Sequence, residues 1–194
     1  FAEMGSINPV IITPSAIAKR GNEIAKTYAG SITLGTGQFC TNPGLLLTIK
    51  DENTQDFVNE LAKETIALDP QCMLHPNIKS GYEKKGGDVT SQLGVEVVGK
   101  VEGDLEPNYA ASVVATVSGT EFLANPKLHQ EVFGPFSMVV QCKDEAALLQ
   151  IIEGLEGQLT GTLIAEENDS LDLVEIVDAL ENRVGRIIYN GVPT

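Results

Sequence analysis

Basic side chains are scarce in this chain of 194 residues, which has 13 Lys and Arg against 27 Asp and Glu and a formal net charge of −14. Affinity for nucleic acids and for anionic membrane surfaces comes largely from Lys and Arg side chains that neutralise phosphates. The composition therefore argues against both kinds of partner. A small-molecule substrate or a protein contact is the better expectation.

Cysteines and long apolar runs are also few. Cys40, Cys72 and Cys142 are widely spaced and form no C-x-x-C pair, so the sequence encodes neither a disulfide framework nor a zinc ribbon. No apolar run approaches the roughly 20 residues that a membrane helix needs, and no basic-then-apolar leader is visible. We therefore expect a cytoplasmic protein in a reducing compartment, without a membrane span.

Apolar periodicity predicts strands that alternate with helices. Strands are expected at residues 10–13, 45–49, 95–98, 111–117, 136–142, 159–165 and 184–189. Helices are expected after the Thr13-Pro14 cap until residue 35, from 53 or 54 to before 69, in a short piece at 78–84 that breaks at Gly86-Gly87, at 145–152 and at 171–180. This alternation is typical of an α/β domain with a largely parallel sheet, as a three-layer α/β/α fold.

Three motifs that imitate known sites are rejected. Gly94 to Lys100 has the glycine and lysine spacing of a phosphate loop, but Val101 stands where a hydroxyl is needed and the segment looks like a strand. The glycines before Cys40 resemble a dinucleotide fingerprint, but they follow a helix rather than a strand. His75 and His129 are far apart without metal-ligand spacing, so we expect surface or helix-end roles and no metal site.

Cys40 stands out among the three cysteines. It falls on a turn-rich loop between a helix and a strand, where Gly37 and Gly44 allow the backbone to come close to a ligand. Such a position suits a nucleophile whose own backbone N–H can donate to a developing oxyanion. Cys72 and Cys142 lack this setting, and we expect them to be inert, buried thiols.

Two carboxylates are candidate partners of Cys40, although each also has a simpler interpretation. Glu3 lies in the segment of residues 1–9, which stands just before the expected strand at 10–13. An acid near a chain terminus is usually a solvated charge, but beside an apolar strand end its pKa can rise so that it serves as a general base. Glu131 precedes an aromatic residue and a Gly-Pro turn, where a simple helix-end charge is the alternative.

Four segments together resemble the aldehyde dehydrogenase superfamily. Residues 3–9 are similar to the family's glutamate motif, residues 37–40 to its cysteine motif, residues 131–135 to its E-x-F-G-P motif, and residues 184–191 to its late strand ending in Asn. They occur in the family's order over nearly the whole chain. The amino-acid sequence of residues 5–9 and 37–44 looks most like that of one branch of the family. This branch contains the α-ketoglutaric semialdehyde (2,5-dioxovalerate) and NADP-dependent fatty aldehyde dehydrogenases.

The resemblance implies a role for each matched residue. Cys40 would attack an aldehyde to give a thiohemiacetal and then, after hydride loss to NADP or NAD, a thioester. Glu3 would activate the water that hydrolyses this thioester. Glu131 would hold the ribose hydroxyls on the nicotinamide side of the cofactor, and Phe133 would pack near the ring.

The resemblance also implies that residues 1–194 are one catalytic domain excised from a longer enzyme, which would be a homo-oligomer. The family's N-terminal cofactor-binding domain, its C-terminal oligomerisation segment and the Asn that supplies the second oxyanion donor have no counterpart here. Many relatives carry an Arg five residues after the cysteine, where this chain has Leu45. We expect the fragment alone to be inactive.

Other functions remain open at this stage. Cys40 and Glu3 could hydrolyse esters or thioesters without a cofactor, or the domain could be an inactive scaffold. Transfer of the acyl group to coenzyme A is disfavoured, because relatives that do so generally lack the glutamate matched by Glu3.

Overall fold

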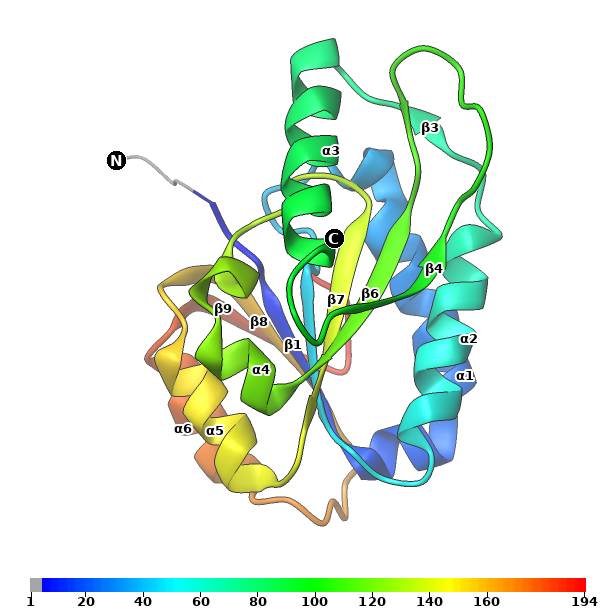
Figure 1. Ribbon diagram of the computed structural model, residues 1–194. Coiled ribbons are helices and arrows are strands. Elements are labelled where there is room, and N and C mark those ends of the chain that lie inside the picture. Colours follow the sequence, from blue (N-terminus) through cyan, green and yellow to red (C-terminus); the bar gives the residue numbers. More distant parts are fainter. Residues whose placement is uncertain (1–4) are drawn as a thin grey trace.

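The computed structural model describes residues 5–194 (Figure 1), and Phe1 to Met4 lie outside the described part. The strands of the main sheet are β1 (Pro9–Ile12), β2 (Leu45–Ile49), β4 (Glu96–Lys100), β6 (Val113–Ser118), β7 (Phe136–Cys142), β8 (Gln158–Ile164) and β9 (Val184–Tyr189). The helices are α1 (Pro14–Thr33), α2 (Thr54–Ile66), α3 (Pro76–Thr90), α4 (Gly119–Ala124), α5 (Glu145–Gly154) and α6 (Leu173–Glu181). Shorter pieces are β3 (Gln71–Cys72), β5 (Tyr109–Ala110) and the 3-10 helices η1 (Leu34–Gly37) and η2 (Pro126–His129).

Within residues 5–194 the main sheet has seven strands in the order β4-β6-β7-β2-β1-β8-β9. All neighbouring pairs are parallel except β4 and β6. The register places Pro9 beside Leu45, and Leu45 beside Met138. The amino ends of β1, β2 and β7 therefore lie next to one another at the same edge of the sheet. This confirms the expected largely parallel α/β sheet.

Helices cover both faces of the sheet, which makes three layers (Figure 1). On one face α1 and α2 pack together over an apolar cluster that includes Val10, Ile12 and Leu46. On the other face α4, α5 and α6 cover a second cluster that includes Ile11 and Leu47. Successive residues of β1 alternate between the two clusters because strand side chains point to opposite faces.

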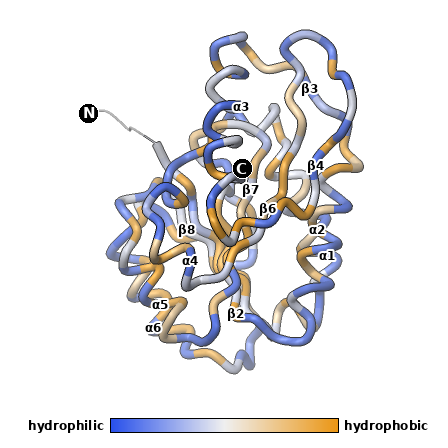
Figure 2. Tube along the Cα trace, in the orientation of Figure 1, coloured by the Kyte–Doolittle hydropathy of each residue, from blue (hydrophilic) through white to orange (hydrophobic). Residues whose placement is uncertain are grey.

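Hydropathy follows the same layers, since apolar residues gather along the strands while the outer surfaces of α1 and α2 are mainly polar (Figure 2). Within the described residues, no helix combines the length and the apolar character needed to cross a membrane.

The connection from β1 to α1 is set by local chemistry. The Thr13 hydroxyl accepts a hydrogen bond from the Ala16 N–H (3.2 Å), and Pro14 occupies the first helical position. Both features were expected from the Thr13-Pro14 pair, because a hydroxyl satisfies an orphan N–H and proline has none to satisfy. The helix then continues to Thr33 with a kink at Arg20, whose φ of −145° is not helical.

The predictions for residues 70 to 130 were partly wrong. Helix α3 does not stop before Gly86 but runs through both glycines to Thr90. Tyr82 and Val89 of α3 are buried in the apolar cluster on this side of the sheet, so tertiary packing of these side chains offsets the low helix propensity of glycine. The two-stranded sheet β3-β5 and helix α4 had no sequence prediction, because elements this short carry no clear periodicity.

Candidate active site

Cys40, Glu131 and Phe133, the described residues among those singled out in the sequence, lie at the amino edge of the sheet. Ser6 and Ile7 precede β1, Cys40 lies on the loop before β2, and residues 131–135 lead into β7. Because β2 lies between β7 and β1, these loops are neighbours. In most open α/β sheets ligands bind outside the carboxyl ends of the strands, so this arrangement differs from the general rule.

Cys40 is exposed on a tight turn. The turn is closed by hydrogen bonds from the Asn42 N–H to the Phe39 carbonyl (3.0 Å) and from the Gly44 N–H to the Asn42 carbonyl (2.9 Å). The thiol is therefore accessible, as a nucleophile requires, while its backbone is held.

The glycines of the cysteine loop allow neighbouring backbone segments to come close. A Cβ on Gly37 would lie 2.2 Å from the carbonyl carbon and oxygen of Gly134, and one on Gly44 would lie 3.4 Å from the Ile7 carbonyl oxygen. Protein backbone thus lies beside both glycines, and the expectation that they bring the loop close to a ligand stays a prediction. They bring the cysteine loop against its neighbours, and the Asn42 amide adds a hydrogen bond to the Gly134 carbonyl (3.0 Å).

Helix α3 supports the turn that contains Gly134. A Cβ on Gly134 would lie 2.3 Å from the ring of Tyr82. The Tyr82 hydroxyl donates to the carbonyls of Ala111 (2.6 Å) and Pro135 (3.3 Å). Burial, and less strongly the charge of Glu83, raises the pKa of Tyr82 above its ordinary value, so the hydroxyl keeps its proton. Lys85, one turn further along α3, donates to the Glu131 carbonyl (3.3 Å).

The Glu131 carboxylate is half-buried and faces the segment that precedes β1. The Ser6 N–H donates to its Oε1 atom (3.4 Å). A Cβ on Gly5 would lie 3.2 Å from its Oε2 atom, so the glycine allows the carboxylate to lie close to the backbone of this segment. A cavity of about 510 Å³ opens here, lined in part by Gly5, Glu131 and Gln158. A carboxylate beside open space can accept hydrogen bonds from ribose hydroxyls, so the residues fit the nicotinamide half of a dinucleotide.

Phe133 is half-buried on the same turn and, with Gly37 and Asn42, lines a small cavity of about 20 Å³. Glu3 lies outside the described residues, so its assigned role stays a prediction. The structure thus brings Cys40, Glu131 and Phe133 to adjacent loops.

The remaining titratable candidates have structural roles. Cys142 is buried, and burial followed by the charge of Asp144 raises its pKa to about 12. Cys72 is exposed, so the expectation that it is buried was wrong: its short strand β3 lies at the edge of a two-stranded sheet. His75 caps α3 through the Asn77 N–H (3.1 Å), and His129 stacks on Phe122 with ring centroids 4.4 Å apart, as expected for helix-end residues. Among residues 5–194, no group of three or more His, Cys, Asp and Glu side chains is arranged to hold a metal ion.

The comparison with known proteins agrees with this geometry. The sequence profile described as "Aldehyde dehydrogenase family" matches residues 1–194. The chain belongs to the aldehyde dehydrogenase family. The resemblance found in the four motifs is thereby confirmed.

Two curated relatives of the family match along the whole chain. The chain is 39% identical over 195 residues to alpha-ketoglutaric semialdehyde dehydrogenase 2 of Azospirillum brasilense. It is 38% identical over 200 residues to alpha-ketoglutaric semialdehyde dehydrogenase of Acinetobacter baylyi. In both cases it spans 37% of the relative's length.

A solved structure supports the family fold. Indole-3-acetaldehyde dehydrogenase in complex with NAD+ superposes with a TM-score of 0.76 at 16% identity, covering 97% of this chain and 39% of that one. At this identity the likeness concerns the fold alone.

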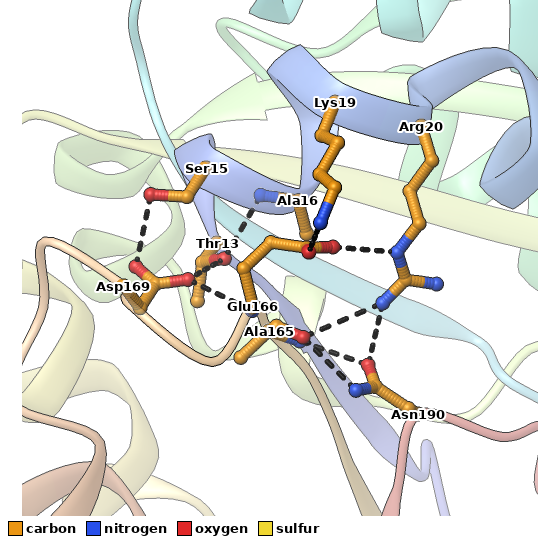
Figure 3. A network of polar contacts seen from close by, with 9 residues as sticks. All are labelled: Thr13, Ser15, Ala16, Lys19, Arg20, Ala165, Glu166, Asp169 and Asn190. Carbon is orange, nitrogen blue, oxygen red and sulfur yellow. Dashed lines mark hydrogen bonds and ion pairs between the residues drawn. The ribbon is translucent and has the colours of Figure 1, made fainter.

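The carboxyl edge of this aldehyde dehydrogenase sheet is closed by a polar network (Figure 3). Glu166 accepts hydrogen bonds from Lys19 (2.6 Å) and Arg20 (2.7 Å), and Arg20 also donates to the Asn190 side chain (2.6 Å). Asp169 accepts from the hydroxyls of Thr13 and Ser15. These contacts join α1 to the ends of β8 and β9 and occupy the edge where α/β folds commonly bind ligands.

Sequence reasoning missed Asn8, Asn42 and Gln158. Asn8 is buried within the glutamate motif, and its amide contacts both the cysteine loop and β8. The sequence held a clue, because Asn8 is a polar residue directly before an apolar strand. A buried polar side chain at such a position needs hydrogen-bond partners. Gln158 offered no such clue, since one glutamine near a strand end is unremarkable.

Proposed function

We propose that the chain is the catalytic domain of an NAD(P)-dependent aldehyde dehydrogenase, with Cys40 as its nucleophile. The observation that carries this proposal is the placement of an exposed Cys40 thiol and the Glu131 carboxylate on loops held together by the Gly37 and Gly134 contact. Family membership over residues 1–194 adds support from outside the site. We take α-ketoglutaric semialdehyde as the substrate, because both curated relatives bear that name.

In the proposed reaction the Cys40 thiolate attacks the aldehyde carbon, a C–S bond forms and the carbonyl oxygen takes the negative charge. The backbone N–H of Cys40 donates to that oxygen. When bound, NAD(P)+ would accept the hydride from the carbon that Cys40 has attacked. A thioester of Cys40 then remains. Glu3 then takes a proton from water, which adds to the thioester and releases the carboxylic acid and the thiolate.

Glu131 and Phe133 are the residues of this chain proposed to hold the cofactor. The Glu131 carboxylate would accept the ribose hydroxyls in the cavity beside Gly5, and Phe133 would pack near the nicotinamide. NADP and NAD are both open as the cofactor; the solved structure with NAD+ supports dinucleotide use in the family fold.

The proposal extends to the setting of the domain. We propose that the whole enzyme is a cytoplasmic homo-oligomer and that residues 1–194 alone do not oxidise aldehydes. The chain spans 37% of the length of the relatives. We assign most of the cofactor contact to the rest of the enzyme.

The test uses the full-length enzyme that carries this segment. Reduced cofactor is measured with α-ketoglutaric semialdehyde and with long aliphatic aldehydes, each with NAD+ and with NADP+. We expect turnover with the short dicarboxylic semialdehyde and its loss in Cys40→Ser. If the enzyme reduces no cofactor with any aldehyde but hydrolyses an activated ester without cofactor, the proposed oxidoreductase activity is wrong. The protein would then be a hydrolase.

A second readout separates an enzyme from an inactive scaffold. Alkylation of each cysteine is followed by peptide mass spectrometry across a pH series. A working nucleophile reacts faster and at lower pH than an ordinary thiol, so Cys40 should label ahead of Cys72. Equal labelling of these two exposed cysteines would favour the scaffold.

A further inference from the structure

The side chain of Asn8 is the centre of a buried polar cluster at the amino edge of the sheet. Its Nδ2 atom donates to the carbonyl oxygens of Cys40 (2.9 Å) and Asn42 (3.0 Å). Its Oδ1 atom accepts from the Ser6 hydroxyl (2.9 Å) and from the N–H (3.2 Å) and hydroxyl (3.1 Å) of Thr160. Only 1% of Asn8 is exposed, so its amide is shielded from water.

Gln158 anchors the same segment from β8. Its Oε1 atom accepts from the Ile7 N–H (2.7 Å), the Ser6 hydroxyl (3.1 Å) and the Asn8 N–H (3.3 Å). The Ser6 hydroxyl in turn accepts from the Leu159 N–H (3.0 Å). The segment before β1 is therefore fixed to β8, and through Asn8 it reaches across to the cysteine loop.

The backbone at Asn8 restricts which residues can occupy the position. Its φ of +46° lies in the left-handed region, which asparagine, aspartate and glycine tolerate better than other residues. A β-branched or long side chain there would add strain. The conformation turns the amide away from β1 and toward the two carbonyls that flank Thr41.

We propose that Asn8 is a positioning residue for the Cys40 nucleophile: its Nδ2 donor holds the Cys40 and Asn42 carbonyls and so fixes the direction of the thiol. The inference rests on the proposed function, because it assigns Asn8 a part in the reaction of Cys40. The two carbonyls belong to a turn outside regular structure that is closed by its own backbone hydrogen bonds. The Asn8 amide ties this turn to the segment before β1, so loss of the amide frees the turn to shift against that segment. A shift of the attacking atom by about 1 Å costs on the order of 100-fold in rate.

The decisive variant is Asn8→Asp in the full-length enzyme. It keeps the shape, tolerates the left-handed backbone and retains an oxygen for Ser6 and Thr160, but it replaces the NH2 donor. Asn8→Gly is the second variant, because glycine accepts the same backbone conformation while removing the whole amide. Asn59→Asp is the matched control, since it is the same chemical change at an exposed position of α2 and keeps the oxygen that accepts from Gln55 (3.0 Å).

We expect Asn8→Asp and Asn8→Gly to lower kcat by about 10- to 100-fold while the KM for the aldehyde changes by less than about threefold. Alkylation of Cys40 should slow relative to Cys72 in the same sample. Cys142, which is buried, should stay protected and so report an intact fold. Asn59→Asp should match the wild type in all three readouts.

Wild-type kcat and Cys40 labelling in a folded Asn8→Asp enzyme would overturn the inference. Loss of Cys142 protection in both Asn8 variants would also overturn it, because Asn8 would then serve the fold alone. The proposed function fails separately, when the wild-type enzyme reduces no cofactor. In that case the Cys40 to Cys72 labelling ratio still compares Asn8→Asp with the wild type.

Discussion

The backbones of Gly37 and Gly134 lie against each other, although the two residues are 97 positions apart in the sequence. A Cβ on Gly37 would lie 2.2 Å from the Gly134 carbonyl. Gly37 also has a φ of +63°, which side chains other than glycine rarely adopt. This contact sets the cysteine loop against the turn that follows Glu131.

Gly37→Ala should therefore destabilise the protein by about 2–4 kcal/mol, the sum of left-handed strain and overpacking against backbone. The measurement is the free energy of unfolding in denaturant. Gly30→Ala is the control, since nothing lies within 4 Å of a Cβ there and the position is in helix α1. That change should raise stability by up to about 1 kcal/mol. Equal effects at the two positions would contradict the close approach.

Cys142 should resist alkylation in the native protein even at alkaline pH. Burial raises its pKa to about 12, so almost no thiolate is present at pH 8, and the side chain is inaccessible. Labelling should begin only when denaturant unfolds the chain. Peptide mass spectrometry on samples across a denaturant series checks this, with exposed Cys72 as the internal reference. Fast native labelling of Cys142 would be inconsistent with its place in the core.

Glu166 should make stability depend on pH in the acid range. Hydrogen bonds from Lys19, and then from Arg20, hold the pKa of Glu166 below its ordinary value of 4.5. Because the native pKa is the lower one, the ionised carboxylate stabilises the fold above pH 4.5, and this stabilisation is lost as pH falls through the native pKa. Glu166→Gln should thus be less stable than wild type at neutral pH, and the difference should shrink in acid.

The measurement for Glu166 is the unfolding free energy of both proteins at several pH values. Glu167→Gln is the matched control, as its neighbouring carboxylate is exposed on the same loop. A difference between Glu166→Gln and wild type that is constant from neutral to acid pH would contradict the ion-pair account.

Glu131→Gln should weaken cofactor binding in the full-length enzyme by about 10- to 150-fold, because a hydrogen bond to a charged acceptor contributes about 1.5–3 kcal/mol. Binding of reduced cofactor is followed by fluorescence, which does not depend on turnover. Glu153→Gln on the exposed side of α5 serves as the control. Unchanged binding in Glu131→Gln would remove Glu131 from the proposed cofactor site.

Much of the fold could be predicted from local pattern. Strands β2, β7 and β9 have the predicted bounds, because each is rich in apolar residues and lies between strong breakers or helix caps. Helix α3 could not be predicted in full, since Gly86 and Gly87 signal a break that the burial of Tyr82 and Val89 overrides. The position of Cys40 on a loop was predictable from its Gly and Pro neighbours, but what those glycines touch was not.

The sequence by itself determined the α/β alternation, the capped start of α1, the exposed loop of Cys40 and, through four ordered motifs, the family. Only the tertiary structure decided that Asn8 holds the Cys40 loop and that Gln158 holds Asn8. Those partners are 32 and 150 residues apart, and they meet because β1 pairs with β2 on one side and β8 on the other. Local propensities act over a few residues, whereas strand order depends on how the whole chain buries its apolar faces.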